Sequence, residues 1–183
     1  MSNLRSRSGF WIEAAISYPH TNEKGVTKDI NEKYLVEAAD FGQAEERIRK
    51  EMNCDNRTIR VKTVTRPKYA EICFDDGSGI DTYFKVKVVI HEEVETKGGT
   101  DFKIKDTKKL HIVQAADVES ARQAVNEGIY KKSMLDYDID DVVKTKLIGI
   151  LEYGKHIERS CDDSGGGLDG KTGSAEEVQC ADH

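Results

Sequence analysis

The side chains in this sequence that could carry catalytic or metal chemistry are not spaced for it. The four cysteines, Cys54, Cys73, Cys161 and Cys180, form no CxxC pair, and no histidine lies within a few residues of the first two. Zinc sites usually show such close spacing, so we predict free thiols. The histidines lie outside any Gly-x-Ser-x-Gly or comparable nucleophile motif. We therefore predict a protein that is not an enzyme and that has no cofactor and no metal site.

Two other groups are interpreted as solvated surface. His91 and His111 lie on neighbouring predicted strands and could face each other, but we interpret them as half-exposed strand residues. An acidic run remains open as a weak cation or partner surface, although a solvated turn is the favoured interpretation; it comprises Asp136, Asp138, Asp140 and Asp141.

Basic residues alternate with apolar ones along three predicted strands, and this pattern suggests a binding surface. The period of two places each basic pair on the face opposite its apolar neighbours. If the strands share a sheet, they form one basic surface that can follow a phosphate backbone, with Tyr69 and Tyr83 beside it to stack unpaired bases. The alternative is that exposed lysines only keep the sheet soluble and block edge pairing. The candidate nucleic-acid-binding residues are Arg60, Lys62, Tyr69, Lys85, Lys87, Lys103 and Lys105.

An internal repeat indicates which elements hold these residues. The segment Tyr34–Asp40 (YLVEAAD) matches His111–Asp117 (HIVQAAD) at an offset of 77 residues, and Ala44 and Ile48 match Ala121 and Val125 at the same offset. Both identity and periodicity are kept, so we interpret the match as a duplication.

The residue pattern within each repeat predicts the same order of elements: strand, strand, helix, strand. Aromatic-led strands open the repeats at 10–16 and 83–90, and hairpin tips follow at 21–25 and 95–99. Helices are predicted over 41–52 and 118–131, with Asp40 and Asp117 as N-caps and Gln43 completing a capping box. The closing strands are 58–65, and 139–143 continuing into 146–153. The predicted core comprises Trp11, Ile12, Leu35, Phe41, Ile48, Phe84, Val86, Ile112, Val125 and Ile148.

The predicted fold class is α+β, a tandem ββαβ duplication with antiparallel sheet. We expect a flexible N-terminus at 1–9, a first unit at 10–74, a short link at 75–79 and a second unit at 80–153. Residues 160–183 are rich in glycine and acids, and this composition predicts a disordered tail.

The doubled strand and Ala-Ala-Asp helix pattern resembles an uncharacterised domain-of-unknown-function family of gut anaerobic bacteria and their phages. The resemblance covers roughly residues 10–153. It implies a bacterial or phage origin, and it implies no activity and no catalytic residue.

Charge and composition bound the remaining possibilities. The net charge is −6, but residues 158–183 hold seven acidic and two basic residues, so the preceding body is nearly neutral. No secretory signal and no apolar run long enough to cross a bilayer is found, which predicts a cytoplasmic protein with no membrane partner.

Our leading expectation is a non-enzymatic binding protein for single-stranded nucleic acid in phage or bacterial DNA metabolism. The alternative is a protein–protein adaptor, or an inhibitor of a host protein, that acts through an exposed edge strand or the acidic tail. The sequence does not fix the oligomeric state.

Overall fold

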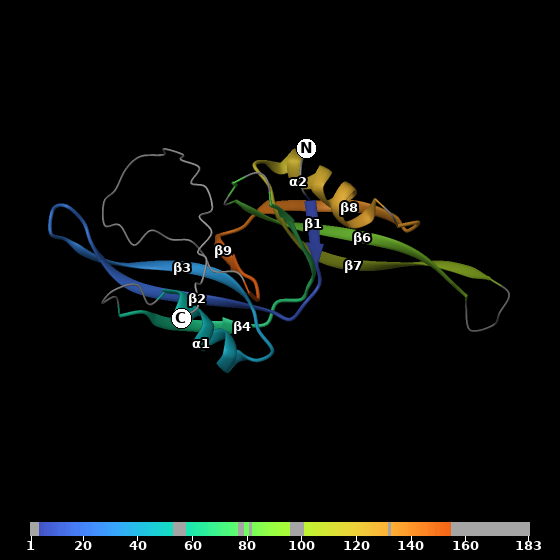
Figure 1. Ribbon diagram of the computed structural model, residues 1–183. Helices are drawn as coiled ribbons and strands as arrows, with labels where there is room; N and C mark the ends of the chain where they lie inside the picture. Colours follow the sequence, from blue (N-terminus) through green and yellow to red (C-terminus); the bar gives the residue numbers. More distant parts are fainter. Residues whose placement is uncertain are drawn as a thin grey trace, which may run out of the picture.

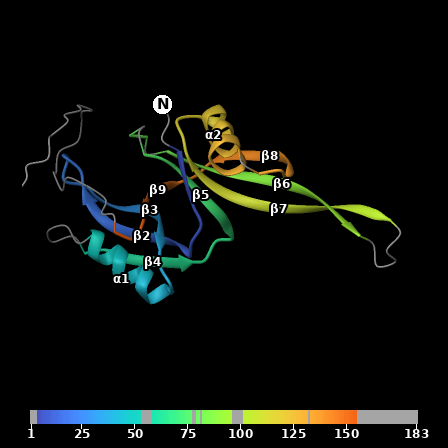
Figure 2. The same cartoon turned by 45° about the vertical axis from the view of Figure 1, so that its right-hand side comes forward.

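Two β-sheets, each carrying one helix on its outer side, make up the fold. A computed structural model describes residues 4–52, 58–76, 79–80, 82–95, 101–131 and 133–154. Within them the strand order is β4-β2-β3-β9 in a four-stranded sheet and β1-β5-β7-β6-β8 in a five-stranded sheet. Figures 1 and 2 show two long hairpins that extend in opposite directions. The α+β fold class is confirmed, whereas the predicted tail at 160–183 lies outside the described residues.

The four-stranded sheet is built mainly from the first unit. Its buried positions alternate along the opening strand, where Ile12, Ala14 and Ile16 pack against the helix. Its elements are β2 (Trp11–Thr21), β3 (Thr27–Glu37), α1 (Phe41–Met52), β4 (Arg60–Thr65) and β9 (Leu147–Leu151).

The five-stranded sheet follows the same plan. Phe84, Val86 and Val88 alternate toward its helix. Its elements are β1 (Leu4–Arg7), β5 (Tyr69–Asp75), β6 (Tyr83–Glu95), β7 (Phe102–Gln114), α2 (Val118–Ala124), the π-helix η1 (Val125–Tyr130) and β8 (Asp136–Lys144).

The two units share a β-bulge at the same position. β2 and β4 shift register between Ala15 and Ile16, and β6 and β8 shift at the corresponding step between Lys87 and Val88. The ββαβ order therefore occurs twice with the same bulge, which supports the duplication that the sequence predicts.

Both predicted helix caps are confirmed. Asp40 Oδ1 accepts from the Gln43 amide at 2.8 Å, and Gln43 Oε1 accepts from the amide of Ala39. The predicted capping box is therefore shifted by one residue, because Gln43 reaches the amide before the N-cap and not that of Asp40 itself. Asp117 Oδ1 accepts from the Ser120 amide at 2.7 Å. These contacts fix where each helix begins, one residue after the aspartate.

The second helix differs from the first in its last turn. Ile48 and Val125 are equivalent at an offset of 77 residues, but the last buried side chains of the two helices, Met52 and Tyr130, lie 78 residues apart. The extra residue falls in η1, because a π-turn accommodates one more residue than an α-turn.

Each unit gives its last strand to the sheet of the other unit. β5, from the first unit, pairs parallel to β7, while β9, from the second unit, pairs parallel to β3. The sequence predicted antiparallel sheet, and the other five strand pairs described are antiparallel. A hairpin can join only antiparallel neighbours, whereas parallel neighbours need a longer connection. β5 and β9 each cross from the other unit instead of following a hairpin turn, so they can lie parallel to their partners.

The inner faces of the two sheets meet in a shared core. Trp11, Leu35 and Leu147 of the four-stranded sheet pack with Ile72, Phe74, Tyr83 and Ile112 of the five-stranded sheet. The units are therefore joined by buried apolar surface as well as by the exchanged strands.

Eight of the ten predicted core residues are buried, and Phe41 and Ile148 are not. Phe41 is 52% exposed, as is Val118 at 44%, because burial on both helices begins one turn later, at Ala44 and Ala121. Ile148 is 42% exposed because it is the extra residue where β9 shifts register against β3, which turns its side chain outward.

The N-terminal segment that the sequence predicted to be flexible contains β1. It pairs antiparallel with β5, from Leu4 opposite Asp75 to Arg7 opposite Ile72. The sequence did not indicate this strand, because its partner lies far along the chain and no local pattern of apolar residues marks it.

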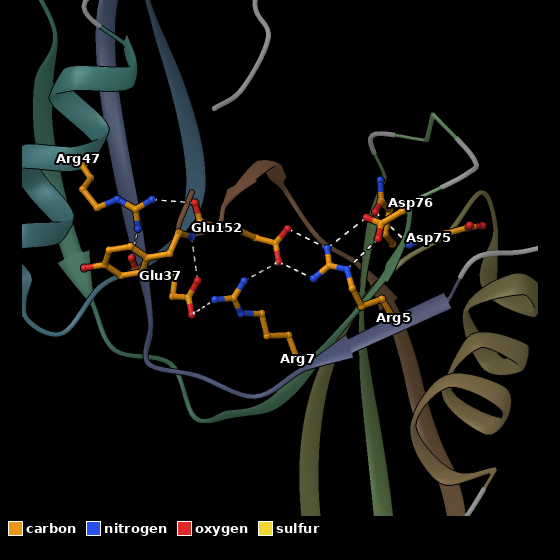
Figure 3. Close-up of polar contacts among 9 residues, drawn as sticks. Arg5, Arg7, Glu37, Arg47, Asp75, Asp76 and Glu152 are labelled. Carbon is orange, nitrogen blue, oxygen red and sulfur yellow. Dashed lines mark hydrogen bonds and ion pairs between the residues drawn. The ribbon is translucent and has the colours of Figure 1, made fainter. Parts of the chain in front are cut away.

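Two arginines of β1 reach the buried carboxylate of Glu152, which follows β9. Arg5 donates to both carboxylate oxygens at 2.7 and 2.8 Å, and Arg7 lies 3.3 Å from one of them. Arg5 also pairs with Asp76, and Arg7 with Glu37 (Figure 3). Glu152 therefore ties β1 to the strand that enters the first unit's sheet.

The helix α1 is attached to the same cluster. Arg47 donates to the carbonyl oxygens of Glu37 and Glu152 (Figure 3). Its guanidinium lies 4.3 Å from the ring centroid of Tyr153. The cluster thus joins both sheets and one helix at Glu152, whose carboxylate receives Arg5 and Arg7 and whose backbone carbonyl receives Arg47.

Replacing Ile48 with Ala should lower the free energy of unfolding by about 2–5 kcal/mol, from lost burial and the cavity left behind. Phe41→Ala on the same helix is the matched control, because Phe41 is half exposed. Chemical denaturation followed by circular dichroism measures both. Equal losses in the two variants would contradict the packing described.

Glu152→Gln should destabilise the protein by about 1–3 kcal/mol, because charge-assisted hydrogen bonds to two arginines are lost in a buried place. Glu45→Gln is the control, since Glu45 pairs with Arg49 on the exposed face of α1 and should cost below about 0.5 kcal/mol. An unchanged midpoint for Glu152→Gln would show that the cluster does not stabilise the sheets.

Candidate lysine pocket between the sheets

The basic residues suggested by the sequence do not form one surface. Arg60 and Lys62 lie on β4, in the four-stranded sheet, while Lys85, Lys87, Lys103 and Lys105 lie on β6 and β7, in the five-stranded sheet. The condition that the strands share a sheet is therefore met by β6 and β7 alone.

Even these two strands present their lysines on opposite faces. Lys85 lies opposite Ile112, on the inner face, whereas Lys103 lies opposite Val94 and Lys105 opposite Glu92, on the helix-covered side of the sheet. The period of two places alternate side chains of one strand on opposite faces. The register of the β6–β7 hairpin then decides which face of the sheet the lysines of each strand occupy.

Two of the candidate cations already have polar partners. Lys87 Nζ lies 2.5 Å from Asp140 on the neighbouring strand, and this hydrogen bond raises the pKa of Lys87. Lys62 Nζ donates to Asn31 Oδ1 at 2.6 Å.

Tyr69 and Lys85, by contrast, meet at a pocket between the two sheets. Its volume is about 180 Å³, and four lysines line it. We call it the lysine pocket; its residues are Glu13, Lys33, Tyr69, Lys85, Val143, Lys144, Thr145, Lys146 and Leu147.

The crossover from β8 to β9 positions two of these lysines. Thr145 sits between them, with its amide and its hydroxyl both donating to the Tyr83 carbonyl at 2.8 Å. The Leu147 amide donates back to the Thr145 hydroxyl at 3.3 Å. Lys144 and Lys146 therefore extend from a backbone that is held on both sides of Thr145.

The pocket carries an excess of positive charge. Its single carboxylate, Glu13, pairs with Lys33 at 2.9 Å. Burial, and then the charge and hydrogen bond of Glu13, raise the pKa of Tyr69, so its hydroxyl stays protonated. No ion pair joins Lys85, Lys144 or Lys146 to any residue of the described ranges, and these three ammonium groups are available to an anion.

Sequence reasoning missed Lys33, Lys144 and Lys146. Lys33 lies at a register shift on β3, and the other two flank the Thr145 crossover, so none belongs to a run of alternating basic and apolar residues. The signal available was the Lys-Thr-Lys sequence at a break between two predicted strands.

The remaining titratable clusters are surface or core features. His91 and His111 do not face each other: His91 pairs with Asp106 at 2.8 Å and Asp138 at 3.3 Å on the inner face. His111 is buried rather than half exposed, its Nε2 lies 3.0 Å from the Tyr130 hydroxyl, and burial lowers its pKa to about 4. In the part of the chain described, no three His, Cys, Asp or Glu side chains are placed to hold a metal ion.

Residues 10–153 match the family model described as Domain of unknown function (DUF4494). No curated protein and no solved structure matches the chain. None of the helices in the described ranges is long and apolar enough to span a bilayer.

Proposed function

This chain belongs to the DUF4494 family, and we propose that it is a non-enzymatic protein that binds single-stranded nucleic acid through the lysine pocket. The observation that carries the proposal is the convergence of Lys85, Lys144 and Lys146 on one pocket without an acidic partner among the described residues. Lysine ammonium groups are compact phosphate ligands, and each phosphate that they neutralise releases condensed counterion.

The size of the pocket favours a single strand over a duplex. A volume of about 180 Å³ takes a small group, such as one phosphate with part of its sugar. A single strand can bend such a group inward, whereas a duplex is stiff, with a persistence length of about 50 nm. Tyr69, half-buried on the pocket wall, offers a ring on which a base can stack.

The setting that fits this activity is the cytoplasm of a bacterium, in its own DNA metabolism or that of a phage that infects it. The acidic C-terminal residues would then compete with nucleic acid for the pocket, because they carry the opposite charge.

Lys85→Ala/Lys144→Ala/Lys146→Ala should weaken binding to a labelled oligothymidylate and flatten its salt dependence by about two units of slope, at about 0.7 per lost phosphate contact. Fluorescence anisotropy over a salt series measures both. Duplex DNA and RNA of equal length report the preference for strand and sugar.

The matched control is Lys28→Ala/Lys103→Ala/Lys105→Ala, which removes the same charge from the two hairpin strands β3 and β7. It should bind as the wild type does, and a loss in the control without a loss in the pocket variant would move the site to the hairpins. No binding at micromolar protein in low salt, with or without residues 160–183, would reject the proposal and leave the adaptor class as the better candidate.

A further inference from the structure

The two equivalent third strands, β4 and β8, are both sheet edges. β4 borders the four-stranded sheet and β8 the five-stranded sheet, and among the strands of the described residues each pairs with only one neighbour. An edge strand leaves backbone amides and carbonyls unpaired along its outer side, where another strand can add.

These equivalent edges carry opposite charge. The common bulge sets the equivalence: Thr63 lies opposite Ala15 and Asp141 opposite Lys87, the residues that precede the bulge on β2 and β6. Counting back along both strands, Arg60 corresponds to Asp138 and Lys62 to Asp140. A basic pair in the first unit thus stands where the second unit has an acidic pair.

The charge of the β8 edge exceeds what its neighbours neutralise. Asp140 pairs with Lys87 and Asp138 with His91, but no direct ion pair joins Asp136 or Asp141 to another described residue. On β4, Arg60 and Lys62 likewise have no acidic partner within the described ranges. These two basic and four acidic side chains are all exposed. The apolar residues of the same strands pack against the two helix-covered cores; they are Val61, Val64, Ile139 and Val142.

We propose that copies of this chain associate head to tail, with the β4 edge of one copy beside the β8 edge of the next. Charges on an edge strand keep like edges apart, so β4 against β4 and β8 against β8 are both disfavoured. Only the β4–β8 contact brings opposite charges together.

The geometry of this contact makes the assembly open-ended. The two surfaces differ, so the first copy keeps a free β8 edge and the last a free β4 edge, and the contact extends until rotation closes a ring. Short oligomers or filaments, rather than a symmetric dimer, are the expected products.

Analytical ultracentrifugation of the full chain, freed of nucleic acid, tests the proposal across a concentration series at low and high salt. The wild type should associate with rising concentration, and salt should weaken the association because the contact is solvent-exposed. Arg60→Glu/Lys62→Glu and Asp136→Lys/Asp138→Lys/Asp141→Lys should each weaken self-association by more than about tenfold, since each makes both edges alike in charge.

A mixture of the two variants should associate again, because one then has two acidic edges and the other two basic edges. Misfolding cannot produce this rescue. Lys103→Glu/Lys105→Glu, away from either edge, is the charge-matched control and should associate as the wild type does. A wild type that stays monomeric to near-millimolar concentration in low salt, a mixture that stays monomeric, or a control that fails equally would each overturn the proposal.

Discussion

The structure depends on the reciprocal exchange of β5 and β9. Each strand completes the sheet of the other unit, so the first sheet needs a strand from the chain's far end, and the second needs one from the unit before it. The buried contacts follow this crossing: Trp11 and Leu147 pack on Ile72 and Ile112 between the sheets, and Glu152, one residue beyond β9, receives Arg5 and Arg7 of β1. A buried carboxylate is tolerated because both of its oxygens are hydrogen-bonded to cations. The exchange also makes the two units one cooperative body, since separating them would open both sheets and the core between them.

The duplication supplies two similar frameworks, and the proposed functions use the places where they differ. Glu13 and Lys85 occupy equivalent positions on the opening strands, as do Tyr69 and Leu147 on the exchanged strands, and all four line the lysine pocket. The pocket therefore spans the junction of the two units and has one basic side. At the sheet edges the same divergence takes the form of charge inversion between β4 and β8. Exposed positions can change charge without destabilising the core, whereas a charge at one of the buried apolar positions of β2 or β6 would destabilise it.

The two proposals are physically separable. The lysine pocket uses the end of β8 and the Thr145 crossover, while the self-association surface uses the earlier part of β8, around Asp136 to Asp141, together with β4. A head-to-tail assembly would repeat the pocket at regular intervals, which is a suitable arrangement for a ligand with a repeating phosphate backbone. Either property can hold without the other, because no residue is shared between the two sets.

The sequence by itself determined the local elements, and the tertiary structure decided how they meet. The helix caps at Asp40 and Asp117, the alternation of Phe84, Val86 and Val88, and the doubled ββαβ order all follow from caps and periodicities that act over a few residues. The strand exchange, β1 and the burial of Glu152 could not be read in this way, because each rests on partners far apart in sequence. The candidate site shows the same division. Alternation correctly put Lys85 and Lys103 each on the face of its strand opposite to its apolar sequence neighbours. The hairpin register, which depends on pairing between distant residues, placed the two lysines on different faces of the sheet, and the tertiary structure brought Lys85 to Lys144 and Lys146.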